Sequence, residues 1–167
     1  MRIGILGSAF DPPHKGHIEV ARRAKHALRL ERLILVPTRV PPHKAAPSLP
    51  GALRFKMARI AAGKRRRWTV SDMELKRQGV SYTRDTIYEL KKRYPGDEIF
   101  WIIGSDSLAS MPWKWKGGYD ILDLCTFVAV RRPGYSLNRV SKRILKKVVL
   151  LCGAKKDISS STIRELF

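Results

Sequence analysis

The stretch from residue 7 to residue 17 reads Gly7-Ser8-Ala9-Phe10-Asp11-Pro12-Pro13-His14-Lys15-Gly16-His17 and decides the fold. It follows a short apolar run at residues 3–6, which predicts a strand buried on both faces. Apolar residues then recur at helical spacing over residues 18–28. Free backbone N–H groups and the helix dipole attract anions at the start of a helix. The stretch therefore predicts a phosphate site between a strand and a helix.

Two histidines open this expected helix. His14 and His17 are three residues apart, so their imidazoles face the same side of the first turn. The pair also fits a capping histidine beside a surface histidine, or half of a metal site. The other histidines and cysteines are His26, His43, Cys125 and Cys152. None of these shows paired ligand spacing, so we favour one shared phosphate ligand and expect no metal site.

Apolar runs alternate with helical patterns along the chain. The runs are residues 3–6, 33–36, 68–70, 99–103, 127–130 and 148–151. Helices are expected over residues 16–28, 53–62, 83–93, 107–110 and 137–147, with another beginning near Ser160. This alternation predicts an α/β fold, a Rossmann-like open parallel sheet with helices on both faces. The 167 residues fit one domain, residues 1–167.

Ligands of open parallel sheets bind beyond the carboxyl ends of the strands. The segments that follow the expected strands there are residues 7–10, 37–44, 104–106 and 131–134. Residues 37–50 contain five prolines, which indicates an ordered, functional loop. We therefore expect these segments to converge on one crevice.

The composition excludes a membrane-spanning protein. Hydrophobic residues make up 44% of the chain, but the longest wholly apolar runs, such as residues 148–152, are short. A membrane span requires ~20 apolar residues. No secretory signal is expected before the first strand. Cys125 and Cys152 are expected as buried thiols in a reducing cytoplasm and not as a disulfide.

The chain is strongly basic. Its 34 Lys and Arg residues against 14 Asp and Glu residues give a formal net charge of +20. A field of this sign implies anionic partners, either phosphorylated substrates, nucleic acid or an acidic membrane surface. The basic runs are residues 64–67, 91–93, 146–147 and 155–156. They fall at expected helix ends and loops, and no nucleic-acid recognition motif accompanies them, so we favour phosphorylated substrates over nucleic acid and expect no membrane partner.

Two signatures at opposite ends of the chain resemble a known superfamily. Residues 7–17 resemble the first signature of the HxGH nucleotidylyltransferases, and Ile-Ser-Ser-Ser-Thr-Ile-Arg at residues 158–164 resembles the second, ISSTxIR. Four more segments resemble bacterial nicotinate-nucleotide adenylyltransferases. They are residues 40–44, 81–83, 131–135, and 104–108 with Pro112 and Lys114 around Trp113. The resemblance covers essentially the whole chain.

The resemblance implies adenylyl transfer from ATP to nicotinate mononucleotide, which gives deamido-NAD and pyrophosphate in NAD biosynthesis. A phosphate monoester has a second pKa near ~6, so the attacking oxygen is already ionised and needs no general base. A direct in-line displacement without a covalent enzyme intermediate is therefore expected. Mg²⁺ is expected to bind together with ATP, because no clustered carboxylates offer it a separate site.

The same resemblance implies three catalytic residues, His14, His17 and Arg164, with His17 stabilising the α-phosphoryl group. Asp106 is expected to accept hydrogen bonds from the ribose, and Arg132 to line the adenosine side. The implied ATP-binding residues are Gly7, Ser8, Phe10, His14, His17, Gly104, Asp106, Arg132, Ile158, Ser159, Ser160 and Arg164. The alternatives are a serine-capped helix with a surface arginine and a helix cap at Asp106.

On the acceptor side, the resemblance implies that Trp113 stacks on the pyridine ring. Backbone N–H groups around Tyr82 and Thr83 are expected to bind the nicotinate carboxylate, and Lys44 to supply charge, with a mobile surface lysine as the alternative. The implied acceptor-binding residues are Ser8, Ala9, Lys44, Tyr82, Thr83 and Trp113. Ala9 stands where the family usually has Thr or Ser, so only a backbone contact is carried over there. The remaining tryptophans, Trp68, Trp101 and Trp115, are expected to pack in the core or on the surface.

Other readings of the same fold remain open. The rival acceptors are nicotinamide mononucleotide and phosphopantetheine, and a reading of another class is a basic nucleic-acid-binding domain without catalysis. Nicotinate is favoured because residues 81–83 and 112–113 occur together. A homo-oligomer is compatible with the sequence.

Overall fold

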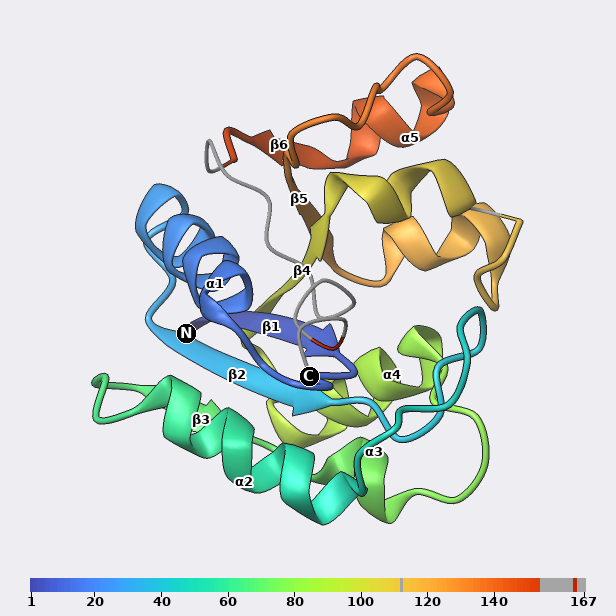
Figure 1. Cartoon of the computed structure of the whole chain (residues 1–167). Coiled ribbons are helices and arrows are strands. Elements are labelled where there is room, and N and C mark those ends of the chain that lie inside the picture. The colour runs from blue at the N-terminus through green and yellow to red at the C-terminus, as the bar shows by residue number, and fades with distance from the viewer. Residues whose placement is uncertain (112, 154–163, 165–167) are drawn as a thin grey trace.

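The centre of the molecule is a sheet of parallel strands. The computed structural model describes residues 1–111, 113–153 and 164. The strands are β1 (Arg2–Ser8), β2 (Arg32–Pro37), β3 (Trp68–Val70), β4 (Glu98–Gly104), β5 (Thr126–Val130) and β6 (Val149–Leu151). Their order is β3-β2-β1-β4-β5-β6, and every neighbouring pair is parallel (Figure 1). The predicted Rossmann-like sheet is confirmed.

Helical segments cover both faces of this sheet. The α-helices are α1 (Lys15–Ala27), α2 (Gly51–Ala62), α3 (Met73–Lys76), α4 (Thr83–Arg93) and α5 (Lys142–Lys147), and the 3-10 segments are η1 (Ser105–Ser110) and η2 (Gly118–Asp123). Helices α1 and α2 pack on one face through Ala21, Ala24 and Ala58. On the opposite face, α3, α4, η2 and α5 contribute a second core that includes Ile87 and Leu90. The strands alternate between the two cores, because successive side chains of a strand point to opposite faces.

The strand order reverses direction next to β1. The chain first builds β1, β2 and β3 outward on one side and then crosses back to place β4 on the other side of β1. In the register of β1 and β4, Ile5 lies opposite Trp101. A crevice forms beyond the carboxyl ends of the strands at such a reversal, because the two neighbouring connections leave in opposite directions.

Most of the expected elements match the structure. The helix over residues 83–93 and the strand over residues 68–70 have the predicted bounds. The helix expected from Leu137 begins only at Lys142, because Ser141 accepts a hydrogen bond from the Arg143 N–H and caps a helix there. Helix α3 and segment η2 were not predicted, since four and six residues are too short to show a helical period. The start near Ser160 lies outside the described residues.

The two cysteines differ in exposure. Burial raises the pKa of the half-buried Cys125 thiol to about 12, so this group behaves as a small apolar side chain. Both cysteines are free, as predicted. The prediction that Cys152 is buried is wrong, because it follows the three-residue edge strand β6 and is exposed. No helix in the described part of the chain is both long and apolar enough to cross a bilayer.

Candidate active site

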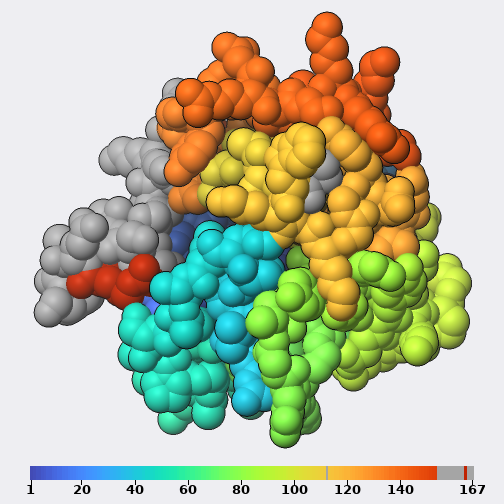
Figure 2. Space-filling view, turned by 90° about the vertical axis from the view of Figure 1, so that its right-hand side faces the viewer, coloured from blue at the N-terminus to red at the C-terminus, as the bar shows by residue number. Residues whose placement is uncertain are grey.

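A cleft of about 940 Å³ opens at the carboxyl ends of the central strands. All four segments expected there contribute to its walls, namely residues 7–9 at the end of β1, 38–48 after β2, 104–107 at the end of β4 and 131–133 after β5. On the surface, the loop after β2, the segment before α4 and the segment around residue 116 adjoin one another (Figure 2). The predicted convergence is confirmed.

His14 and His17 lie against each other at the start of α1. Their rings are stacked with centroids 3.8 Å apart, and both residues line the cleft. The His14 backbone N–H donates to Nδ1 of His17 at 3.2 Å, and Nε2 of His17 lies 3.1 Å from Oγ of Ser8. Because Nδ1 accepts a hydrogen bond, the proton of the neutral imidazole is on Nε2. The ring is therefore oriented with an N–H donor toward the end of β1.

The His17 imidazole is neutral at physiological pH in the ligand-free protein. Burial, helped by the nearby positive charges of His14, Arg132 and Lys44, lowers the pKa of His17 to about 3. These cations disfavour one more positive charge and favour an anion instead. His17 can thus offer a hydrogen-bond donor to a phosphate without first losing its own hydration.

The Phe10 ring packs against the His17 ring. Its ring meets the His17 ring edge-on, with centroids 4.8 Å apart, and only 1% of Phe10 is exposed. The side chain lies in the core and does not line the cleft. The inclusion of Phe10 among the ATP-binding residues is therefore not supported for its side chain, which fixes the position of a histidine.

Asp106 and Arg132 face each other at the crevice where the strand order reverses. The Arg132 guanidinium lies 3.2 Å from Oδ2 of Asp106, and the Arg132 N–H donates to Oγ of Ser105. A Cβ on Gly104 would lie 2.4 Å from Oδ1 of Asp106, so a side chain at this position would displace the Asp106 carboxylate. The absence of a Cβ leaves the carboxylate folded back over the end of β4, where it lines the cleft. Asp106 is the second residue of η1 and Gly104 is its N-cap, so the alternative of a helix cap at Asp106 is wrong.

Gly7 is required for another reason. A Cβ on Gly7 would lie 2.9 Å from the Trp101 ring on the neighbouring strand. The absence of a side chain at Gly7 leaves space for the Trp101 indole, and this residue is only 3% exposed. Gly7, Ser8 and Ala9 all line the cleft, so their backbone groups remain close to any ligand.

Arg164 reaches the first signature from the far end of the chain. Its Nη1 donates to the backbone oxygen of Asp11 at 2.5 Å and lies 3.6 Å from the Asp11 carboxylate. The carboxylate also accepts hydrogen bonds from Ser48 and Leu49 in the loop after β2. Burial opposes ionisation, yet these hydrogen bonds and Arg164 lower the pKa of Asp11. Asp11 therefore joins the two signatures and the proline-rich loop. The predicted Ile158, Ser159 and Ser160 lie outside the described residues.

A buried arginine beneath the cleft was not predicted. Arg54 of α2 is 2% exposed and donates to three backbone oxygens, those of Leu49, Ala9 and Thr38, at 3.0, 2.5 and 2.7 Å. These oxygens belong to the proline-rich loop, the first signature and the end of β2. Arg54 therefore holds three walls of the cleft at a fixed spacing. The sequence carried a signal, because Arg54 stands in line with the buried Ala58 and Ala62 on the core side of α2.

The acceptor side was expected at Tyr82 and Thr83, which line the cleft where α4 begins. Lys44 also lines the cleft, from the proline-rich loop. Lys116 approaches from the opposite wall, with Nζ 4.7 Å from the centre of the Tyr82 ring and 2.9 Å from the Asp85 carboxylate. Sequence analysis missed Lys116, because nothing in the sequence indicates that residue 116 lies beside residue 82.

Trp113 does not line the cleft. It is 83% exposed, which contradicts the expected position inside the acceptor pocket. Trp115 lines the cleft instead and packs edge-on against Phe127, with Nε1 donating to Ser110. Both tryptophans lie between η1, which ends at Ser110, and η2, which begins at Gly118. A stacking role for Trp113 requires the segment around it to turn toward the cleft when a ligand binds.

The cleft as a whole suits a polyanion. Its cationic side chains are Arg23, Lys44, Lys114, Lys116, Arg131, Arg132 and Arg164, and its carboxylates are Asp11, Glu19, Glu74 and Asp106. Within the described residues, no three His, Cys, Asp or Glu side chains come together in a way that could hold a metal ion. The excess of cationic over acidic side chains in the lining is what favours a phosphate ligand.

Comparisons with known proteins decide the family. The Cytidylyltransferase-like family profile matches residues 5–166. A probable nicotinate-nucleotide adenylyltransferase of Shouchella clausii is 42% identical over 98% of this chain and 83% of its own length. One of Thermus thermophilus is 40% identical over 98% of this chain and 85% of its own. The chain belongs to the nicotinate-nucleotide adenylyltransferase family.

Solved structures agree on the fold of this family. Nicotinic acid mononucleotide adenylyltransferase of Plasmodium falciparum, complexed with NaAD, superposes with a TM-score of 0.81 at 22% identity and covers 98% of this chain and 82% of that one. A putative nicotinate-nucleotide adenylyltransferase of Vibrio parahaemolyticus gives 0.64 at 22% identity, with 99% and 86% covered. The resemblance to the family's motifs therefore extends to the arrangement of the whole chain.

Proposed function

We propose that the protein transfers the adenylyl group of ATP to nicotinate mononucleotide, giving deamido-NAD and pyrophosphate in NAD biosynthesis. The observation that carries this is the stacked His14–His17 pair at the start of α1, with Arg164 held beside it by Asp11. The family relatives named above bear the same activity in their names. The free thiols are compatible with a reducing cytoplasm, where we place the reaction.

The chemistry needs alignment and charge stabilisation. An ionised phosphate oxygen of the acceptor attacks the α-phosphorus of ATP, and the bond from that phosphorus to the bridging oxygen breaks as pyrophosphate leaves. We assign His17 Nε2 to the α-phosphoryl oxygens and His14 and Arg164 to the outgoing phosphates. These groups match the charge that develops in the transition state. No side chain has to remove a proton from the attacking oxygen, since it is already ionised.

ATP is expected to enter as its magnesium complex. Mg²⁺ keeps several waters and binds mainly through substrate phosphates in sites of this kind. The carboxylates that line the cleft are dispersed, and two of them, Asp11 and Asp106, are occupied by Arg164 and Arg132. The metal therefore belongs to the substrate in this proposal.

Product analysis tests the function directly. The purified protein would be incubated with MgATP and, in separate reactions, nicotinate mononucleotide, nicotinamide mononucleotide and phosphopantetheine. Chromatography should show deamido-NAD as the main product, with a higher kcat/KM for nicotinate mononucleotide than for the other two acceptors. No turnover of ATP with any acceptor, combined with salt-sensitive oligonucleotide binding, would support a nucleic-acid-binding domain instead.

Replacing Asp106 by alanine should weaken ATP binding. The Asp106 carboxylate is a hydrogen-bond acceptor that lines the cleft beyond β4. A hydrogen bond to a charged group contributes about 1.5–3 kcal/mol. KM for ATP is therefore expected to rise roughly 10- to 100-fold, with a smaller change in kcat. Steady-state kinetics at saturating acceptor would measure this. The matched control is Asp120→Ala, which removes an exposed carboxylate from η2 and should leave KM unchanged.

A further inference from the structure

Glu74 is a buried carboxylate in the floor of the cleft that the proposed reaction does not use. It lies in α3, is 2% exposed, and lines the cleft beside Ser81, Tyr82 and Thr83. Its Oε1 accepts a hydrogen bond of 2.7 Å from the Thr86 hydroxyl. Among the described residues, Oε2 has no hydrogen-bond partner of normal geometry. A carboxylate in this position needs an explanation, because an ionised group is costly to bury.

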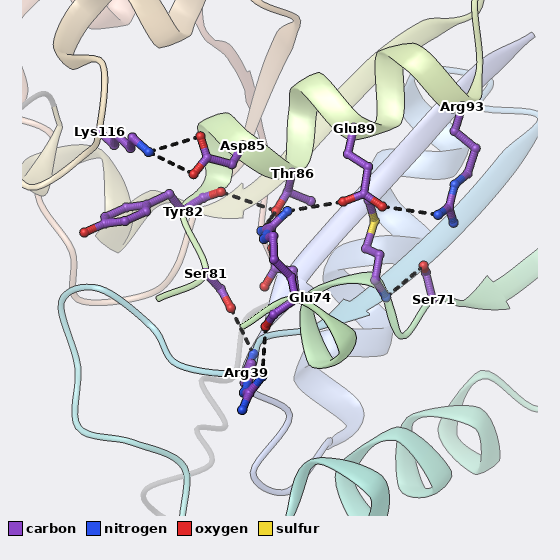
Figure 3. Close-up of polar contacts among 12 residues, drawn as sticks. Arg39, Ser71, Glu74, Ser81, Tyr82, Asp85, Thr86, Glu89, Arg93 and Lys116 are labelled. Carbon is purple, nitrogen blue, oxygen red and sulfur yellow. Dashed lines mark hydrogen bonds and ion pairs between the residues drawn. The ribbon is translucent and has the colours of Figure 1, made fainter. Parts of the chain in front are cut away.

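Thr86 links Glu74 to the first turn of α4. Its hydroxyl lies 2.7 Å from Glu74 and 3.3 Å from the carbonyl oxygen of Tyr82 (Figure 3). The Arg77 guanidinium donates to the same hydroxyl at 2.6 Å. A hydroxyl has only one proton to give, so it bonds either to Glu74 or to the Tyr82 carbonyl. A proton on Glu74 reverses the first bond and frees the Thr86 proton for Tyr82.

Arg77 is the charged group that acts most directly on Glu74, and further ion pairs lie around it. Arg77 follows it on the chain and also pairs with Glu89 of α4, and the Arg39 guanidinium donates to the Arg77 carbonyl. Asp85 and Lys116 pair beyond Tyr82 (Figure 3). Burial is the largest influence on Glu74 and raises its pKa, although the hydrogen bond from Thr86, the Arg77 cation and the hydroxyls of Thr38 and Ser81 favour the ionised form. The neutral acid therefore extends to higher pH than for an exposed glutamate.

We propose that Glu74 is a positioning residue for the carboxylate of the acceptor, acting through Thr86 on the first turn of α4, and that its neutral form is the one that favours this carboxylate. This inference rests on the proposed function. A negative charge on Glu74 repels a second carboxylate that binds beside Tyr82 and Thr83. It also takes the Thr86 proton away from the turn whose backbone N–H groups receive the acceptor. Glu74 thereby links selectivity between acid and amide acceptors to pH.

The test compares two acceptors as pH changes. Nicotinate and nicotinamide mononucleotides share the same phosphate, so its titration cancels in the ratio of their kcat/KM values, and the nicotinate carboxylate stays ionised throughout. Burial raises the pKa of Glu74 above the ordinary value of 4.5, so the measurements run from pH 4.5 to pH 9 with saturating MgATP. The ratio of the nicotinate to the nicotinamide value should fall about tenfold as Glu74 loses its proton. A ratio that stays constant over this range overturns the proposal. Failure to adenylylate either acceptor overturns the proposed function instead.

Variants separate Glu74 from other titrating groups. Glu74→Gln should make the ratio independent of pH, whereas Glu89→Gln on the outer side of Arg77 should keep the wild-type slope. His43→Gln removes the histidine that lines the cleft from the proline-rich loop and should also keep that slope. An unchanged slope in Glu74→Gln contradicts the proposal. Thermal melts would confirm that each variant is folded.

Thr86→Val tests the route of the effect and serves if Glu74→Gln does not fold. It removes the hydroxyl between Glu74 and Tyr82 and keeps the side-chain shape. KM for nicotinate mononucleotide should rise about tenfold, with little change in kcat or in KM for ATP. An unchanged KM, or an equal rise for both acceptors, rules out positioning through Thr86.

Discussion

His17→Ala is expected to lower kcat for deamido-NAD formation by about 10²- to 10³-fold, the usual effect of removing one donor to a developing charge. The structure fixes this donor from three sides, through the His14 backbone N–H, the stacked His14 ring and the edge of Phe10. KM for ATP should change much less, because the donor acts mainly in the transition state. Pyrophosphate release under saturating substrates would measure kcat.

A matched variant and a pH profile sharpen this expectation. His26→Ala alters an exposed histidine in the last turn of the same helix and should leave kcat unchanged. Since the pKa of His17 is lowered to about 3, its protonation state does not change between pH 5 and pH 8 in the ligand-free protein. The pH profile of kcat/KM for the wild-type protein should therefore contain no step near pH 6.5 that is caused by His17. Any step in that range should also be present in the profile of His17→Ala. A kcat within a factor of three of wild type in His17→Ala would contradict the assigned role.

Arg54→Met should produce the largest loss of stability. Three backbone oxygens, those of Leu49, Ala9 and Thr38, lose a donor whose own side chain is only 2% exposed. Each unsatisfied buried group costs roughly 1–3 kcal/mol, so the free energy of unfolding should fall by about 3 kcal/mol or more. For a chain of this size, this corresponds to a fall in Tm of roughly 6–12 °C. Differential scanning calorimetry would measure it.

The appropriate control lies on the same helix. Arg59→Met changes an exposed arginine of α2 and should shift the free energy of unfolding by no more than about 0.5 kcal/mol. Arg54→Lys keeps the positive charge but lacks the branched guanidinium that reaches three oxygens. Its loss of unfolding free energy should therefore lie between those of Arg59→Met and Arg54→Met. Equal melting temperatures for Arg54→Met and Arg59→Met would show that the three hydrogen bonds contribute nothing. Arg54→Met should also weaken the binding of both substrates, because the Arg54 side chain connects several walls of the cleft.

Sequence patterns predicted the sheet and the place of the cleft for physical reasons. Buried parallel strands are continuous apolar runs, and their carboxyl ends must share one edge. That argument placed Ser8, Lys44, Gly104 and Arg132 in one cleft before any coordinates were known. Helix α4 was predicted with its bounds because its apolar period extends over three turns.

The remaining features depend on contacts between distant residues. Arg54 contacts a carbonyl oxygen 45 residues away, and Glu74 contacts a hydroxyl 12 residues away. Local periodicity contains no information about such partners. Trp113 and Trp115 are separated by one residue, and only the turn of the chain between them determines which one faces the cleft. Cys152 is exposed because β6 is a short edge strand, and strand order cannot be read from hydrophobicity alone.

The position of β1 in the middle of the sheet has a consequence for biosynthesis. This strand leaves the ribosome long before β4, almost a hundred residues later, which it needs as its second neighbour. Until residue 104 has left the exit tunnel, one edge of the first strand stays unpaired, so the nascent chain can assemble only the half formed by β1 to β3. Chaperone demand should therefore be highest between the emergence of β3 and that of β4.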